Sequence, residues 1–174
     1  MSLVLPFRDL RPVIDPDAYL ADPPSVIGDV TIGAGSSIWF GTVIRGDVMP
    51  IRIGAQTSIQ DNSVIHVTND VNGTTVGSRV TVGHRVILHG CTVGDDCLIG
   101  MGSILLDNAK IGKGSLVAAG SLVPVGMDVP EGSFVRGSPA VVVGPVKDHH
   151  KAMIEGGWRT YTDYAQRYKK QLGR

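Results

Sequence analysis

Residues 76–105 read VGSRVTVGHRVILHGCTVGDDCLIGMGSIL, and an aliphatic side chain returns in this stretch at almost every sixth position. The residue after the aliphatic position is often glycine, and the residue four places after it is usually small. The same spacing extends in both directions along the chain, and its aliphatic positions are Val26, Ile32, Ile38, Ile44, Ile53, Ile59, Ile65, Val76, Val82, Leu88, Val93, Ile99, Leu105, Ile111, Val117, Val123, Val129 and Val135.

A repeat of six residues is too short for a hairpin or a helix pair, and it is the period of hexapeptide β-helices. Each hexad forms one short strand and a corner, and about three hexads close a triangular coil whose inward side chains stack on those of the next coil. A conventional all-β sandwich is the alternative, but its strands alternate with period two between turns spaced about 8 to 12 residues apart. We therefore expect an all-β parallel β-helix of about six triangular coils over residues 1–140.

The composition agrees with one compact unit. The 16 basic and 16 acidic residues balance, which leaves no electrostatic footprint for nucleic acid or a membrane surface. No apolar run approaches the roughly 18 residues of a membrane span, and no leader peptide is evident, so a cytoplasmic location is expected. Cys91 and Cys97 are too few for a disulfide framework, and Cys97 occupies an inward position of its hexad.

Counting hexads along the chain places two histidines in one column. The fourth, seventh and tenth hexads fall on the same side of the triangle in successive coils. Arg45, His66 and His89 directly follow the inward aliphatic residues of these hexads, so they form one outward column. His84 belongs to the ninth hexad, on a different side, which it shares with residues 60–62.

These positions predict a metal site that one chain cannot complete. Nitrogen ligands bind zinc at about 2.0 to 2.1 Å, so His66 and His89 can share an ion whereas His84 of the same chain is too far away. If all three histidines bind one metal, His84 must come from a neighbouring copy in a closed three-fold ring. Three imidazoles with an open fourth position are typical of catalytic zinc. His149 and His150 belong to no column and are expected on the surface.

Several motifs together resemble the gamma-class carbonic anhydrases and their relatives encoded in carnitine and phenylacetate operons. The motifs are IRGD at 44–47, IQDN at 59–62 with His66, VGH at 82–84 and LHGC at 88–91. The resemblance covers about residues 10 to 140 and continues into the tail. It implies a left-handed β-helix, a homotrimer, and zinc, with iron(II) or cobalt(II) as other candidates, held by His66 and His89 of one subunit and His84 of the next.

The resemblance also implies a reaction, the reversible hydration of carbon dioxide to bicarbonate, in which the metal lowers the pKa of bound water. Gln60 is expected to orient the attacking oxygen, although it could be a plain surface amide. Arg45 and Asp61 are expected to form an ion pair between subunits, with Asp47 as part of it. Their predicted role is to hold the interface and the ligands in place.

This chain departs from the family prototype where the prototype carries proton-shuttle acids. Val48 stands where the prototype has an acidic residue, Ser58 stands where it has asparagine, and Asp70 is the only acid of the loop at 67–75. Since regeneration of hydroxide needs a nearby acid or base, slow turnover is expected. Two other functions therefore stay open: CoA-linked acyl transfer or thioester hydrolysis with a histidine base, and a non-catalytic trimeric accessory protein.

Residues 141–174 are expected to form a linker and a C-terminal helix that packs along the β-helix. The stretch from residue 139 to residue 145 is the candidate linker. An amphipathic helical spacing of three and four links Trp158, Tyr161, Ala165, Tyr168 and Leu172. Lys169 and Lys170 suit its C-terminal end. Tyr161 matches a tyrosine that the family directs toward the metal pocket, and packing alone explains it equally well.

Overall fold

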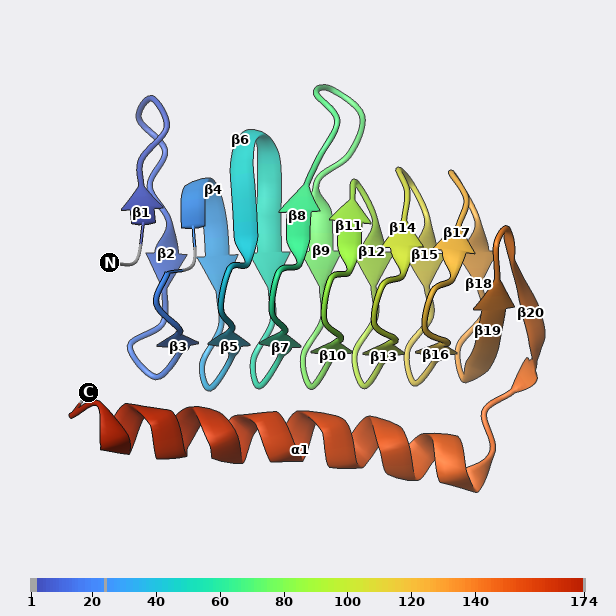
Figure 1. Ribbon diagram of the computed structural model, residues 1–174. Coiled ribbons are helices and arrows are strands. Elements are labelled where there is room, and N and C mark those ends of the chain that lie inside the picture. The colour runs from blue at the N-terminus through green and yellow to red at the C-terminus, as the bar shows by residue number, and fades with distance from the viewer. Residues whose placement is uncertain (1–2, 24, 174) are drawn as a thin grey trace.

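A computed structural model describes residues 3–23 and 25–173, and it confirms a parallel β-solenoid followed by one helix. Figure 1 shows the coils stacked in a row, with α1 (Asp148–Gln171) returning along one side. Within the described residues, no helix is both long and apolar enough to cross a lipid bilayer.

The strands form three sides of a triangular prism. The first side holds β1 (Leu3–Leu5), the first halves of β4 (Ser25–Ile32) and β6 (Val43–Ile53), β8 (Val64–His66), β11 (Ile87–His89), β14 (Ile104–Leu105) and β17 (Leu122–Val123). The second side holds β2 (Val13–Ile14), the second halves of β4 and β6, β9 (Thr74–Val76), β12 (Thr92–Val93), β15 (Lys110–Ile111) and β18 (Asp128–Val129). The third side holds β3 (Tyr19–Leu20), β5 (Ser37–Ile38), β7 (Ser58–Ile59), β10 (Thr81–Val82), β13 (Leu98–Ile99), β16 (Leu116–Val117), β19 (Ser133–Gly137) and β20 (Ala140–Pro145).

The described part of the solenoid has seven coils, one more than the sequence predicts. The third side has eight strands, and seven of them, β3 to β19, contribute one parallel strand to each coil. The additional coil lies at the N-terminal end, where β2 and β3 precede the first hexad of the aliphatic series. Irregular spacing in this first coil hides it from a count of hexads.

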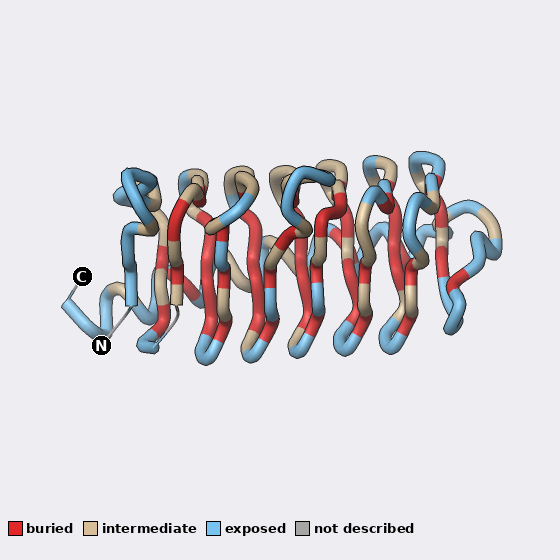
Figure 2. The backbone as a smooth tube through the Cα atoms, turned by 90° about the horizontal axis from the view of Figure 1, so that it is seen from above, coloured by how far each residue is buried: buried red, intermediate tan, exposed pale blue. Residues whose placement is uncertain are grey.

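The inward aliphatic column accounts for the core. Ile44, Ile65 and Leu88 are stacked in register on β6, β8 and β11, and each is 0% exposed. Figure 2 shows the buried residues mostly along the straight stretches of each coil and the exposed residues mostly at the corners. Cys97 is also fully buried, as its inward position predicts. Buried hydroxyls occupy the small positions and bond the next coil: Ser63 Oγ donates to the Gly83 carbonyl at 3.1 Å.

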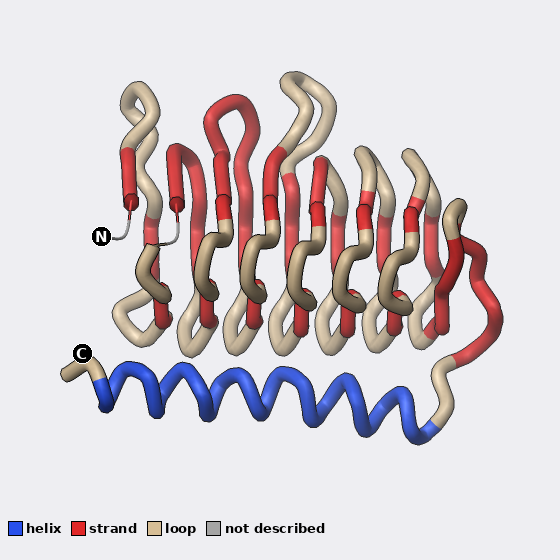
Figure 3. Tube along the Cα trace, viewed as in Figure 1, coloured by secondary structure: helices blue, strands red, loops and turns tan. Residues whose placement is uncertain are grey.

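Two insertions leave the regular path of the coils. The first is contained within β6, which continues from one side of the prism to the next. The second is the loop between His66 and Thr74, which is closed by an isolated bridge between Thr68 and Asn72. Figure 3 shows this loop projecting beyond the corners of its neighbours, on the edge of the solenoid away from α1. Both insertions lie next to the first-side histidine column.

The C-terminal segment differs from the prediction in two respects. Residues 139–145 were expected to be a linker, but Ala140–Pro145 forms β20 and pairs antiparallel with β19. His150 was expected at the surface, but it is buried, with its ring stacked on Phe134 at 4.4 Å between centroids. An aromatic neighbour from a strand of the last coil was not visible in the local sequence around the helix start.

Helix α1 packs across the third side and contacts β3, β5, β7, β10 and β13. Ala165 is buried, and Tyr161 and Tyr168 place their rings edge-on to Trp39 at 5.5 and 5.4 Å. Leu172, the last residue of the predicted apolar stripe, is 53% exposed. The predicted packing is therefore confirmed for the middle of the helix, from Tyr161 to Tyr168, and is wrong for Leu172 in the last turn.

Candidate metal centre

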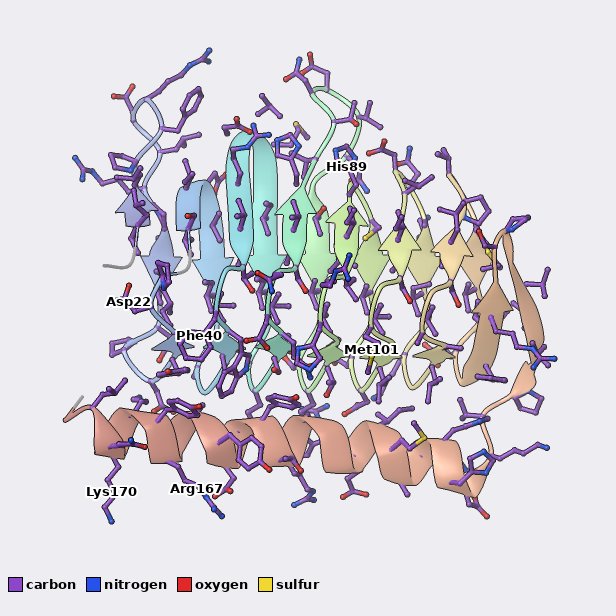
Figure 4. All side chains as sticks on the ribbon, viewed as in Figure 1. Asp22, Phe40, His89, Met101, Arg167 and Lys170 are labelled. Atoms are coloured by element: carbon purple, nitrogen blue, oxygen red, sulfur yellow. The ribbon has the colours of Figure 1, made fainter. Side chains whose placement is uncertain are left out.

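Two of the three candidate histidines lie side by side on the first side of the prism. The β8–β11 register pairs His66 directly with His89, and their ring centroids are 5.4 Å apart. Their side chains are 20% and 30% exposed, so each ring is accessible at the surface without being free in solvent. Figure 4 shows His89 on the upper part of the solenoid, away from α1.

His84 lies on a different side, immediately beyond β10, and does not join this pair. Its side chain is 43% exposed, and its Nδ1 lies 2.8 Å from an oxygen of Asp61. Within residues 3–23 and 25–173, no three His, Cys, Asp or Glu side chains of one chain converge to hold a metal ion. One chain therefore brings His66 and His89 together, whereas its His84 lies on a different side of the prism.

A carboxylate accompanies each of the three histidines. Asp47 lies 3.0 Å from Nε2 of His66, Asp61 accompanies His84, and Asp107 lies 3.3 Å from Nδ1 of His89. A carboxylate only accepts hydrogen bonds, so the facing ring nitrogen is the donor, and in the neutral ring the other nitrogen carries the lone pair. That nitrogen is Nδ1 in His66 and Nε2 in His89. Imidazole ligands oriented by carboxylates are the usual arrangement around protein-bound zinc, and this donor set fits such an ion.

Arg45 and Asp47 form an ion pair within the chain. Partial burial alone raises the pKa of Asp47, but hydrogen bonds from His66 and Arg45 outweigh burial and hold that pKa below its ordinary value. The sequence predicts an ion pair of Arg45 with Asp61 of a neighbour in which Asp47 also takes part, and the pair between subunits stays a prediction. Within one chain, Arg45 has Asp47 as its partner and Asp61 has His84.

Gln60 and Tyr161 meet His84 at a cavity of about 570 Å³ between the third side and α1. Gln60 is 5% exposed, so it is not the surface amide of the alternative interpretation. Burial and the nearby charge of Asp61 raise the pKa of the Tyr161 phenol. Tyr161 lines the cavity and also packs on Trp39, and its direction toward a metal pocket stays a prediction.

The two cysteines lie in the core, and burial disfavours the thiolate form of both. Burial raises the pKa of Cys91 to about 12 and the pKa of Cys97 to about 11. Thiolate is the form of cysteine that binds metals and attacks electrophiles. Since neither thiol ionises near neutral pH, the chemistry of the centre depends on histidine and carboxylate side chains.

Comparison with known proteins finds relatives along most of the chain. The hexapeptide-repeat family described as bacterial transferase hexapeptide (six repeats) matches residues 90–124. A carbonic anhydrase of Geobacillus kaustophilus is 47% identical over 167 residues, which cover 96% of this chain and 91% of that protein. The mitochondrial gamma carbonic anhydrase 1 of Arabidopsis thaliana is 44% identical over 163 residues, which cover 91% of this chain and 59% of that protein.

Among solved structures, a Bacillus cereus protein described as a candidate acetyltransferase, the product of the BC4754 gene, superimposes with a TM-score of 0.95. It is 40% identical, and the match covers 98% of both chains. Two of these relatives are thus described as carbonic anhydrases and one as a candidate acetyltransferase.

Proposed function

Because the chain belongs to the gamma carbonic anhydrase family of hexapeptide-repeat proteins, we propose that it catalyses the reversible hydration of carbon dioxide at a metal centre shared between two copies of the chain. The observation that carries the proposal is the register of β8 and β11, which pairs His66 with His89 while His84 lies on another side. A second copy is needed to bring His84 to the pair. A closed three-fold ring supplies such a contact at each of its interfaces.

An apolar hollow beside His84 supports an interface at this place. The hollow has a volume of about 460 Å³, and Ile87, Met101 and Ile104 are among the residues that line it. Met101 is 58% exposed and Ile87 is 37% exposed in the single chain. Exposed apolar side chains gathered around a hollow are typical of protein–protein contacts. We propose that these side chains are covered in a homotrimer.

The proposed ligand set is His66 and His89 of one subunit with His84 of the next. Zinc is the proposed metal, and iron(II) or cobalt(II) would accept the same donors. Such an ion supplies Lewis acidity that makes a water-derived nucleophile available near neutral pH. The chain's own contribution is to hold the imidazoles of His66 and His84 in fixed tautomers, through Asp47 and Asp61.

Gln60 and Tyr161 are the proposed catalytic side chains beside the ligands. Both line the cavity that His84 borders, and the apolar wall of this cavity excludes bulk water from one side of the reacting group. The Gln60 amide can accept a hydrogen bond from the attacking oxygen and so fix the direction of its lone pair. Proton removal falls to solvent, since no shuttle acid replaces those of the family prototype, and turnover is expected to be slow.

Arg45 is proposed to change partners when the trimer forms. Its side chain is 44% exposed and lies on the side of the histidine column, so a neighbour's Asp61 can approach it. A bidentate arginine–carboxylate pair across the interface would fix the two subunits in register. Asp47 then keeps its hydrogen bond with His66.

Metal content and activity test the proposal together. The purified protein is expected to hold about one divalent ion per subunit, the number that three shared interfaces in a trimer provide. His84→Ala should lose that ion and the stopped-flow hydration of carbon dioxide while keeping its circular dichroism spectrum. His149→Ala removes an exposed histidine near the start of α1 that also borders the cavity beside His84, and it should keep the metal. Full metal occupancy in His84→Ala would refute a shared centre.

Acyl transfer is the second candidate, favoured by the size of the cavity beside His84 and by the description of the Bacillus cereus relative. A volume of about 570 Å³ is large for carbon dioxide and suits an acyl chain. In that case His84 acts as a general base, and metal is not required. Thioester cleavage of acetyl-CoA that persists in chelator and is lost in His84→Ala would select this function.

A further inference from the structure

Asp107 joins the histidine column to the loop between His66 and Thr74, and no motif of the sequence points to it. It lies in the corner after β14, one coil beyond His89. One oxygen of its carboxylate lies 3.3 Å from Nδ1 of His89. The other accepts a hydrogen bond of 3.0 Å from the Thr68 hydroxyl in the loop. The Thr68 hydroxyl thus binds one oxygen of the Asp107 carboxylate, while the other oxygen contacts the ring of His89.

Gly90 leaves the space through which this carboxylate reaches His89. The residue has φ +59°, in the left-handed region that favours glycine. A β-carbon built at Gly90 would collide with the Asp107 carboxylate. The residue after the histidine therefore has to lack a side chain if Asp107 is to occupy its place.

The loop is attached to the histidine strands by further polar contacts. Thr74 Oγ1 donates to the His66 carbonyl at 2.8 Å and accepts from the Gly90 amide at 2.9 Å. Asn72 donates to the Gly90 carbonyl at 3.3 Å. These contacts fix the backbone on both sides of the column. Among the residues that contact this loop, Asp107 also contacts the ring of His89.

We propose that Asp107 is a positioning residue for His89: it holds the ring with Nδ1 as the donor and Nε2 free, while Thr68 holds the carboxylate in place. The inference rests on the proposed metal centre, in which Nε2 of His89 binds the ion. A carboxylate behind an imidazole ligand fixes its tautomer and raises its basicity. Loss of the carboxylate should therefore weaken metal binding without disturbing the coil.

Asp107→Asn is the principal variant, because it keeps the shape of the side chain and removes its charge. The expected result is a loss of zinc affinity of about 10- to 100-fold, the usual effect of removing such a partner. Competition with a chromophoric chelator measures the affinity, and the visible spectrum of the cobalt(II)-loaded protein should shift. Thr68→Val, which removes only the support of the carboxylate, should give a smaller loss.

Asp95→Asn is the matched control. Asp95 lies at a corner like Asp107, its carboxylate occupies the space over Gly77, and it accepts a hydrogen bond from the Ser78 amide at 2.8 Å. No histidine contact of Asp95 is found among the described residues. Asp95→Asn should affect thermal stability as much as Asp107→Asn does, with wild-type zinc affinity. Equal zinc affinity in the two variants would overturn the positioning role.

Nitrogen NMR of the metal-free protein separates this inference from the proposed function. In the wild type, the neutral form of the His89 ring should carry its proton on Nδ1, and in Asp107→Ala the neutral ring should show the mixture of tautomers of an unrestrained histidine. A wild-type protein that binds no metal yet shows the Nδ1-protonated ring would refute the metal centre and keep the positioning role. An unchanged tautomer in Asp107→Ala would refute the positioning role, whatever the metal content.

Discussion

At the scale of single residues, the direction of a side chain decides what it contributes. Val123 points into the coil and is 0% exposed, whereas Val125 in the following corner is 63% exposed. Val123→Ala should lower the free energy of unfolding by roughly 2 kcal/mol, because it removes buried methyl groups and leaves a cavity. Val125→Ala should change it by less than about 0.5 kcal/mol. Urea unfolding of the two variants measures the difference, and equal losses would contradict the inward column.

The residues that the sequence predicted best are those on the regular part of the repeat. Hexad counting places His66 beside His89 and His84 on another side, because strand residues alternate inward and outward with a fixed period. It does not find Asp107, which contacts His89 from a corner. Corner side chains follow local turn geometry, and the hexad period carries no information about their direction.

At the scale of elements, helix α1 contains two adjacent glycines in different surroundings. A β-carbon at Gly156 would have open space, whereas one at Gly157 would lie 2.7 Å from the Thr81 hydroxyl on β10. Gly156→Ala should stabilise the protein by about 0.5 to 1 kcal/mol through helix propensity. Gly157→Ala should destabilise it, because the helix must move away from the third side. Thermal melts of the two variants should shift in opposite directions, and a shared direction would contradict the packing of α1.

An ion pair between Lys169 and Asp17 attaches the C-terminal end of α1 to the first coil. Lys169 Nζ lies 3.1 Å from an Asp17 oxygen, and hydrogen bonds from Lys169 and Gln166 hold the pKa of Asp17 below its ordinary value of 3.8. This contribution is present above pH 3.8 and is lost as the pH falls through the lowered pKa. Since Asp17 is 58% exposed, the contribution is below about 1 kcal/mol.

Acid should therefore loosen the last turns of α1 before the coils unfold. Tryptophan fluorescence measured in a Trp158→Phe background reports this change at Trp39, because Tyr161 and Tyr168 pack on its ring. Lys169→Gln should show the loosened signal already at neutral pH and lose most of the acid response. A wild-type response that Lys169→Gln retains in full would assign the effect to another group.

Element boundaries were predicted less well than the repeat. The apolar spacing in the tail predicted the helix, whereas β20 was missed, since residues 139–145 carry prolines and glycine and do not continue the hexad. β20 exists because it pairs with the exposed edge of β19 and so covers the end of the last coil. His150 is buried by contact with Phe134, which lies 16 residues earlier in the chain (150 − 134). Both outcomes depend on tertiary contacts that local patterns do not encode.

At the scale of the whole molecule, the shape of the prism keeps His84 apart from the other two proposed metal ligands. Three sides at fixed angles keep His84 away from the His66–His89 pair, and stacked coils leave little freedom to bring them together. A metal centre made of all three therefore requires an assembly, and its stability depends on subunit concentration. Dilution that dissociates the trimer should release metal in the same concentration range.

Subunit complementation is the most direct test of a centre shared between copies. His84→Ala and His89→Ala should each bind no metal when purified alone. When the two variants are unfolded together and refolded as a mixture, a mixed ring contains one interface whose ligands are all intact. Random assembly of equal amounts in a three-fold ring predicts recovery of about a quarter of the full metal content, with hydration activity in proportion. A mixture that binds no more metal than either variant alone would contradict the shared centre.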